Sequence, residues 1–278
     1  MSKPIRVLIV DDSAMVRRVL TLGLSADPGI EVVGAVSNAE AAWALMQHER
    51  PDVVTLDIEM PGMDGLTFLK TYLAKIPIPT VMIASLTREG AQITLRAMEA
   101  GAVDVIAKPT VGLADGLPGI MSGVCARVRA AAGARVMVGS RSAVRTSAQA
   151  APVAVPRGAP SGTVIALGAS TGGVQALSRI LPLFPEDSPG IVIVQHMPER
   201  FTASFAEQLQ ARTGRPAREA QDGENREASR RRLAQQLFQQ GLAALGHGRE
   251  QMQEHAEQLV GISLAGIESD RREREERA

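Results

Sequence analysis

The sequence has few aromatic residues and a single cysteine. Phenylalanine, tryptophan and tyrosine together make up 3% of its 278 residues, so its hydrophobic cores must consist of aliphatic side chains and methionine. Cys125 is the only cysteine, which excludes a disulfide bond within the chain and fits a reducing compartment. The first residues, Met1–Pro4, lead directly into a strand-like segment without the apolar stretch of a signal peptide.

An excess of charge and a long apolar run are also missing. The 30 basic and 30 acidic residues cancel, so the net charge does not indicate attraction to nucleic acids or membranes. No apolar run approaches the roughly 20 residues of a membrane-spanning helix. The C-terminal residues 225–278 contain no basic recognition helix or basic patch, which argues against a transcriptional regulator. We therefore expect a cytoplasmic protein that binds no nucleic acid and is not inserted into a membrane.

The first 132 residues alternate short β-branched segments with amphipathic segments. The apolar runs are continuous, as expected for parallel strands that are buried on both faces of a sheet. This alternation predicts a flavodoxin-like, doubly wound α/β domain over residues 1–132. The expected strands are Ile5–Val10, Glu31–Val36, Val53–Leu56, Thr80–Ala84 and Val103–Ala107, and the expected helices are Ser13–Ala26, Ala39–His48, Leu66–Ala74, Glu89–Ala100 and Gly116–Ala131.

A linker and a second α/β pattern follow. Residues 133–162 are rich in Ala, Ser, Arg, Pro and Gly and show neither strand nor helix periodicity, which is typical of a linker. Residues 163–224 predict part of a second doubly wound, Rossmann-like domain with a parallel sheet. Its expected elements are the strands Thr163–Gly168 and Ile191–Gln195 and the helices Gly173–Leu183 and Phe201–Arg212.

From residue 225 onward the composition changes again. Proline disappears after Pro216, and apolar residues fall at helical spacing between Leu233 and Ile262. The last residues, Glu268–Ala278, are almost all charged, which is typical of a frayed or disordered end. We therefore expect residues 225–278 to form a divergent tail, helical from about Ser229 to Ile262 and charged at its end.

Polar side chains follow the predicted strands of the first domain. Asp11 and Asp12 follow the first strand, and Asp57 follows the third. Ser85 and Lys108 follow the fourth and the fifth. These strand ends meet near the topological switch point of a doubly wound sheet. Three converging carboxylates are tolerable when a hard divalent cation lies among them, and oxygen ligands suit Mg²⁺. The lysine and the hydroxyl could then hold the remaining oxygens of a phosphoryl group.

Each of these positions has a simpler explanation when it is taken alone. A single Asp after a strand is usually a turn residue or a helix cap. The combination of Asp-Asp, Asp, Ser and Lys-Pro at four different strand ends is much harder to obtain by capping alone. The sequence therefore favours a metal and phosphoryl site at this edge of the sheet.

Three segments give the first domain a family pattern. They are Val7-Leu-Ile-Val-Asp-Asp-Ser13, Asp57-Ile-Glu-Met-Pro-Gly-Met-Asp-Gly65 and Ala107-Lys-Pro109, and they resemble the receiver domain of two-component response regulators. The resemblance implies a chemotaxis histidine kinase as phosphodonor. It also implies the roles of individual residues: Asp57 as phosphoacceptor, Asp11, Asp12, Asp57 and the backbone carbonyl of Glu59 as Mg²⁺ ligands, and Ser85 and Lys108 as the phosphate switch. One departure is Val105, which stands where the family usually has an aromatic switch residue.

A serine and a histidine mark the second domain. Ser170 lies in Gly168-Ala-Ser-Thr-Gly172, between a strand and a helix, which is the context that a G-x-S-x-G nucleophile turn requires. His196 ends the next strand, and a parallel crossover would bring both residues to the same edge of the sheet. The imidazole could then act as the base for the hydroxyl. A glycine-rich turn with a capping serine, followed by an unrelated histidine, is the simpler alternative.

The second domain also has a family pattern. Its segments Ile165-Ala-Leu-Gly-Ala-Ser-Thr-Gly-Gly-Val174, Gln195-His-Met-Pro198 and Phe201-Thr-Ala-Ser-Phe-Ala-Glu-Gln-Leu209 resemble the catalytic domain of the CheB chemotaxis methylesterases. The resemblance implies a protein-glutamate methylesterase and protein-glutamine glutaminase, with Ser170 as nucleophile and His196 as general base. The implied substrates are glutamate methyl esters on methyl-accepting chemotaxis receptors, and the esterase chemistry needs no cofactor.

We expect the resemblance to end near Asp222–Glu224. The family continues with further strands and with a Gly-Met-Gly-x-Asp-Gly segment, whose aspartate orients the histidine, and we find no such segment here. Asp187 precedes its strand and is expected at the opposite edge of the sheet, while Asp222 and Asp270 have no matching context. We therefore expect a partial esterase domain with strongly reduced activity.

Two other functions stay open. The tail could supply a substitute acid and keep the esterase active. Alternatively, the chain could be a non-enzymatic module whose phosphorylated receiver competes for a histidine kinase. Esterase turnover on methylated receptor, measured with and without a phosphodonor, distinguishes these possibilities.

Overall fold

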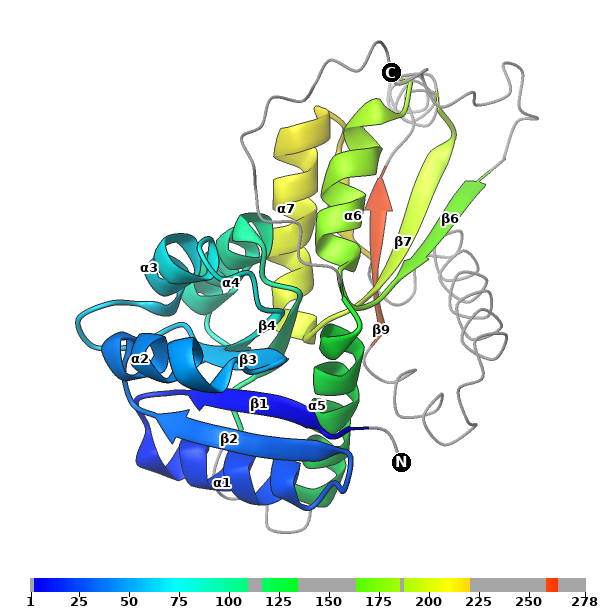
Figure 1. The fold of residues 1–278 in the computed structure, drawn as a ribbon. Coiled ribbons are helices and arrows are strands. Elements are labelled where there is room, and N and C mark those ends of the chain that lie inside the picture. The colour runs from blue at the N-terminus through cyan, green and yellow to red at the C-terminus, as the bar shows by residue number, and fades with distance from the viewer. Residues whose placement is uncertain (1–2, 110–116, 135–163, 186–187, 221–258, 265–278) are drawn as a thin grey trace, which may run out of the picture. The chain divides into compact units, whose positions relative to one another are not determined.

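The computed structural model describes residues 3–109, 117–134, 164–185, 188–220 and 259–264 (Figure 1). Contacts within the chain divide it into two compact units, Met1–Arg141 and Ser142–Ala278. Each unit has its own β-sheet, and the two are described separately below. Among the described helices, none is both long enough and apolar enough to cross a bilayer.

The first unit contains a five-stranded sheet in the order β2-β1-β3-β4-β5, and all of its strand pairs are parallel. The two strands β3 and β4 are buried along their whole length, because they lie inside the sheet and helices cover both faces. This strand order confirms the predicted flavodoxin-like, doubly wound domain. The strands are β1 (Ile5–Val10), β2 (Ile30–Val36), β3 (Val53–Asp57), β4 (Thr80–Ala84) and β5 (Asp104–Ala107).

Helices cover both faces of this sheet. In Figure 1, α1 and α5 lie on one face and α2, α3 and α4 lie on the other. The aliphatic residues Val16, Leu20 and Leu24 of α1 pack with Val124 and Val128 of α5 and with the strands, as the low aromatic content predicts. The helices are α1 (Ala14–Ser25), α2 (Ala39–Glu49), α3 (Gly65–Phe68, continued by a π-helical turn over Leu69–Leu73), α4 (Arg88–Ala100) and α5 (Leu117–Ala132).

Short polar side chains fix where four of these helices begin. Ser13, Asn38, Asp64 and Thr87 each precede a helix in extended conformation and accept a hydrogen bond from a backbone N–H three residues later. Such caps satisfy backbone donors that have no partner within the helix. Two of these caps, Ser13 and Thr87, lie within two residues of Asp12 and Ser85, so they also hold the loops that carry these two residues.

The second unit contains a four-stranded sheet in the order β6-β7-β9-β8. Strands β6 and β7 form the expected parallel pair, in which Ala169 lies opposite Gln195. Helices α6 and α7 cover one face of this sheet (Figure 1). Phe205 and Leu209 of α7 are buried, as is Phe201, which directly precedes the helix. The elements are β6 (Val164–Ala169), α6 (Gly173–Ile180, continued by a 3₁₀ turn over Leu181–Leu183), β7 (Gly190–His196), a 3₁₀ turn (Glu199–Phe201), α7 (Thr202–Thr213), β8 (Ala217–Glu219) and β9 (Leu259–Leu264).

The prediction of a helix up to Ile262 is wrong for its last residues, because Leu259–Leu264 forms strand β9. It pairs antiparallel with β7 on one side and with β8 on the other. The segment contains two β-branched residues, Val260 and Ile262. All six of its residues pair with β7, and Ile262–Leu264 also pair with β8. Tertiary pairing therefore outweighs the helical spacing of the apolar residues. The remainder of the predicted helical tail, residues 225–258, lies outside the described residues, as does the charged end.

Candidate functional site

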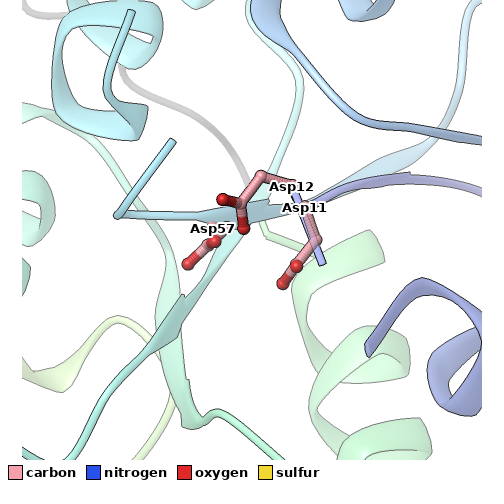
Figure 2. Close-up of side chains that lie close together, drawn as sticks. All are labelled: Asp11, Asp12 and Asp57. Carbon is pink, nitrogen blue, oxygen red and sulfur yellow. The ribbon is translucent and has the colours of Figure 1, made fainter. Parts of the chain in front are cut away.

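Three carboxylates converge at the carboxyl edge of the first sheet. Asp11 and Asp12 follow β1, and Asp57 is the last residue of β3. Each side chain can offer one oxygen such that the three oxygens lie within 4.8 Å of one another, and Figure 2 shows the three gathered at this edge. Asp11 and Asp57 are buried, whereas Asp12 is exposed. The structure thus brings together the three acids that the sequence predicts.

Lys108 reaches into the same cluster from the end of β5. Its Nζ lies 2.7 Å from Asp57 Oδ2, 3.6 Å from Asp11 Oδ1 and 3.8 Å from Asp12 Oδ1. The backbone N–H of Lys108 donates to the carbonyl of Ala84 at 2.7 Å, which extends the pairing of β4 and β5 past the strand end. One ammonium therefore faces three carboxylates, which leaves an excess of negative charge at the site.

Burial dominates the electrostatics of this cluster. It raises the pKa of Asp57 to about 6, against the lowering effect of the hydrogen bond from Lys108. It also raises the pKa of Asp11, although the Ser13 backbone N–H and the Lys108 charge oppose the shift. Burial alone would lower the pKa of Lys108, but the hydrogen bond to Asp57 and the three acidic charges raise it. The ammonium thus stays charged, while the two buried carboxylates are compensated only in part.

The residues present fit a divalent cation. Asp11 Oδ2 is buried and has no hydrogen-bond partner among the described residues. An unpaired buried carboxylate oxygen is costly, and a cation at this position would satisfy it together with oxygens of Asp12 and Asp57. The acidic cluster could therefore bind a metal ion.

The hydroxyl of Ser85 has a partner that the sequence does not predict. Ser85 Oγ donates to Glu59 Oε1 at 2.8 Å, and it also lies 3.3 Å from Thr87 Oγ1, the hydroxyl that caps α4. The backbone N–H of Glu59 donates to Asp57 Oδ1 at 3.3 Å. The side chain of Glu59 therefore links the acidic cluster to the start of α4, whereas the sequence analysis assigned a role only to its backbone carbonyl.

A cavity of about 390 Å³ lies beside the cluster. Acidic side chains, including Asp12 and Glu59, and apolar ones, including Ile58, Met60 and Ile93, line it. It leaves room next to Asp12 and Glu59 for a small molecule or for the side chain of a partner protein.

Ser170 and His196 lie next to each other in the second unit. Ser170 follows β6 and His196 ends β7, and because these strands are parallel neighbours, both residues come to the carboxyl edge of the sheet. Ser170 Oγ lies 3.4 Å from His196 Nδ1, which is at the long end of hydrogen-bond distances. His196 is buried. Such contacts are often long in the absence of substrate.

A tight turn presents Ser170. The backbone N–H of Gly173 donates to the carbonyl of Ser170 at 2.7 Å, and Gly172 adopts φ 77°, a conformation that favours glycine. Helix α6 begins directly after this turn. Backbone N–H groups at the start of a helix are suited to stabilise an oxyanion. The turn therefore places the Ser170 hydroxyl beside an imidazole and at the start of a helix.

Comparison with protein-family models gives two matches. Residues 7–113 match the response regulator receiver domain, and residues 165–272 match the CheB methylesterase. The chain is a CheB-like response regulator. We refer below to its two units as the receiver domain and the methylesterase domain. The second match runs past Glu224, beyond the point where the sequence analysis expected the resemblance to end.

Curated relatives are named protein-glutamate methylesterase/protein-glutamine glutaminase. The chain is 60% identical over 219 residues to "Protein-glutamate methylesterase/protein-glutamine glutaminase of group 2 operon" of Cereibacter sphaeroides, an alignment that covers 79% of this chain and 58% of the relative. It is 47% identical over 225 residues to "Protein-glutamate methylesterase/protein-glutamine glutaminase 1" of Caulobacter vibrioides, covering 79% of this chain and 62% of the relative. The chain thus spans about three fifths of the length of these relatives.

Among solved structures, the chain is similar to the response regulator domain of Thermotoga maritima CheB. The sequence identity is 38%, the TM-score is 0.44, and the match covers 48% of this chain and 99% of that structure.

The sequence offers three acids, Asp187, Asp222 and Asp270, that could complete a triad with Ser170 and His196. All three lie outside the described residues.

Val105, which stands where receiver domains usually have an aromatic residue, is buried in β5. Its carbonyl accepts a hydrogen bond from Arg127, and Arg127 also pairs with Asp104 at 2.8 Å. This buried pair ties α5 to β5.

Proposed function

We propose that the receiver domain accepts a phosphoryl group on Asp57 from a chemotaxis histidine kinase. The observation that supports this most strongly is the convergence of Asp11, Asp12 and Asp57 on one ammonium, with Lys108 Nζ 2.7 Å from Asp57 Oδ2. A carboxylate oxygen of Asp57 attacks the phosphorus, the bond from phosphorus to the donor nitrogen breaks, and an aspartyl phosphate results. Lys108 then pairs with an oxygen of the phosphoryl group in place of the free carboxylate.

Mg²⁺ is the proposed metal. Asp11, Asp12, Asp57 and the backbone carbonyl of Glu59 would hold it, because hard oxygen ligands suit this ion. When bound, it neutralises negative charge on the phosphoryl oxygens. The Ser85 hydroxyl is proposed to leave Glu59 and donate to the phosphoryl group.

For the methylesterase domain we propose hydrolysis of glutamate methyl esters on methyl-accepting chemotaxis receptors, and deamidation of glutamines there. Ser170 Oγ attacks the ester carbonyl while His196 accepts its proton. The histidine then gives this proton to the departing methoxide oxygen, and methanol leaves. In the second step His196 takes a proton from a water molecule, the water oxygen attacks the acyl-serine, and the proton returns to Ser170 Oγ. The 3.4 Å approach of Ser170 Oγ and His196 Nδ1 supports these roles.

The test measures methanol release from methylated receptor, with and without a small phosphodonor such as acetyl phosphate. We expect slow release that stops in Ser170→Ala, and an increase with phosphodonor that is lost in Asp57→Ala. A rate of methanol release in Ser170→Ala that equals the wild-type rate contradicts the esterase assignment. Phosphorylation of Asp57 without any ester hydrolysis supports the alternative of a non-enzymatic receiver that competes for the kinase.

A further inference from the structure

One buried amide links the two strand ends that carry Ser170 and His196. Gln195 is the penultimate residue of β7 and is 2% exposed. Its Nε2 donates to the carbonyl of Ser170 at 3.0 Å and to the carbonyl of His196 at 3.1 Å. Both neighbours are acceptors, so only the donor nitrogen of the amide can face them. The side chain therefore connects the backbone of the serine turn directly to the backbone of the histidine.

The serine turn is shaped to receive this amide. A Cβ at position 173 would lie 2.1 Å from Gln195 Oε1 and 2.7 Å from Ala169 Cβ, so only glycine fits there. Gly173 also donates its backbone N–H to the carbonyl of Ser170, at 2.7 Å. The carbonyl of Ser170 thus accepts two hydrogen bonds, one from each side of the turn. Two donors on one carbonyl fix the orientation of that peptide, and with it the direction in which the Ser170 side chain leaves the backbone.

The contact between the serine and the histidine leaves little tolerance for movement. Ser170 Oγ and His196 Nδ1 are already 3.4 Å apart, and a contact of about 3.6 Å no longer counts as a hydrogen bond. A displacement of about 1 Å in a reacting pair can cost about 100-fold in rate. Loss of the bridge between the two strand ends would therefore alter the distance between the reacting atoms, although the hydrogen bonds of Gln195 go to backbone carbonyls.

We propose that Gln195 is a positioning residue, whose amide sets the separation and direction of Ser170 relative to His196. This proposal rests on the proposed esterase chemistry of that pair. It assigns a role to the first residue of the segment Gln195-His-Met-Pro198, which the mechanism otherwise leaves without one.

The first test compares Gln195→Met with Val194→Ala. Methionine keeps the length of the side chain and removes both donated hydrogen bonds, whereas Val194 is fully buried in the same strand and has no polar side-chain atom. With p-nitrophenyl acetate as the probe, we expect Gln195→Met to lower kcat about 10- to 100-fold with KM changed less than about twofold. Val194→Ala should lower kcat less than about threefold, even at an equal loss of melting temperature. Equal losses of kcat in the two variants, or an unchanged kcat in Gln195→Met, would overturn the proposal.

A conservative variant adds a pH readout that a purely structural role would not produce. In Gln195→Glu the protonated carboxyl group can donate one of the two hydrogen bonds, whereas the ionised form has no donor and faces two carbonyl oxygens. We expect kcat of this variant to fall as the new carboxyl group ionises, in a step that the wild-type profile does not show. A profile parallel to the wild type counts against the role.

The second measurement does not need turnover. The ¹⁵N chemical shifts of the His196 imidazole report its hydrogen bond with Ser170, and Ser170→Ala provides the reference for loss of that bond. We expect Gln195→Met to shift these signals toward the Ser170→Ala values. Signals that stay at the wild-type position in Gln195→Met overturn the positioning role even when the chain hydrolyses no ester, and so separate its failure from failure of the proposed function.

Discussion

The receiver domain and the methylesterase domain both place their candidate sites at the carboxyl ends of parallel strands, but different forces define the two sites. In the receiver domain, side chains from the ends of β1, β3 and β5 converge, and one ammonium faces three carboxylates. In the methylesterase domain, two neighbouring strand ends bring a neutral hydroxyl to an imidazole, and backbone hydrogen bonds around a glycine turn fix the hydroxyl. Charge and burial therefore govern the first site, and backbone geometry governs the second.

The largest expected effect is the loss of phosphorylation in Asp57→Ala. Mass spectrometry after incubation with acetyl phosphate and Mg²⁺ should show the added mass in the wild type and only background in the variant, because no other carboxylate of the cluster is paired as closely with Lys108. Asp52→Ala, an exposed aspartate at the opposite end of the same strand, serves as the control and should be labelled normally. Equal labelling of the wild type and Asp57→Ala contradicts the assignment.

The next largest effect is on ester hydrolysis in the methylesterase domain. Ser170→Ala removes the nucleophile and should reduce methanol release to the rate of the uncatalysed reaction, while Ser178→Ala should leave it unchanged. Ser178 lies on α6, and its buried Oγ makes no hydrogen bond among the described residues, so its removal has little structural cost. The site would be elsewhere if the two variants lost the same share of activity.

A third difference concerns stability. Proline at position 262 removes a backbone donor in the middle of β9, between β7 and β8, and we expect Ile262→Pro to destabilise the methylesterase domain by about 3 kcal/mol. The receiver domain should keep its unfolding midpoint in urea. Ile262→Val keeps the backbone donor and the β-branched side chain, so it should destabilise the domain far less than Ile262→Pro. Because a helical tail detached from the sheet would leave the methylesterase transition unchanged in both variants, that outcome would argue against the strand.

The buried charge of the receiver domain should appear in its pH dependence. The pKa of Asp57 is raised from 3.8 to about 6 in the folded state, so the folded state binds the proton more tightly than the unfolded state. In EDTA, the contribution of Asp57 to the free energy of unfolding should therefore be highest below about pH 4. It should fall as the pH rises toward 6, by at most about 3 kcal/mol. Urea unfolding at both pH values measures this loss. Asp57→Asn should lack most of the slope, and Mg²⁺ should stabilise the wild type more at pH 7 than at pH 5.

The smallest effect is expected at Glu59. The hydrogen bond from Ser85 to the Glu59 carboxylate is charge-assisted and must break before Ser85 can donate to a phosphoryl group. Weakening it by about 1 kcal/mol in Glu59→Gln should raise the phosphorylation rate about fivefold, in a time course with acetyl phosphate. Glu40→Gln, an exposed residue on α2, controls for the change in net charge. A rate that is unchanged or lower in Glu59→Gln shows that Glu59 does not restrain Ser85.

Several features of the fold and sites can be predicted from sequence because they depend on nearby residues. The continuous apolar run Val53–Leu56 predicts a buried parallel strand, and Asp57 follows it at the edge where the other strand ends meet. The approach of Ser170 to His196 can also be predicted, since one parallel crossover brings the ends of β6 and β7 together. Strand β9 cannot be predicted from the sequence, because its two partner strands lie far away along the chain and its apolar residues also fit a helix.

Side-chain partners are harder to predict than strand ends. The hydrogen bond between Ser85 and Glu59 depends on the rotamers of two residues from different loops, which no local pattern specifies. The bridge made by Gln195 depends on the close approach of its amide to Gly173, which exists only after β6, β7 and α6 have packed. The sequence places these residues next to the sites, and the packed structure decides what they contact.

The position of β9 has a consequence for the order in which the two domains can fold during synthesis. All strands of the receiver sheet are available once Ala107 has left the ribosome, whereas the second sheet must wait for Leu264. At roughly 5–20 residues per second, β7 is then without its second neighbour for several seconds. Its apolar segment Ile191–Val194 would meanwhile present an open strand edge, which other chains can pair with. Nascent methylesterase domains are therefore the part of this protein in which aggregation should begin and where a chaperone should bind.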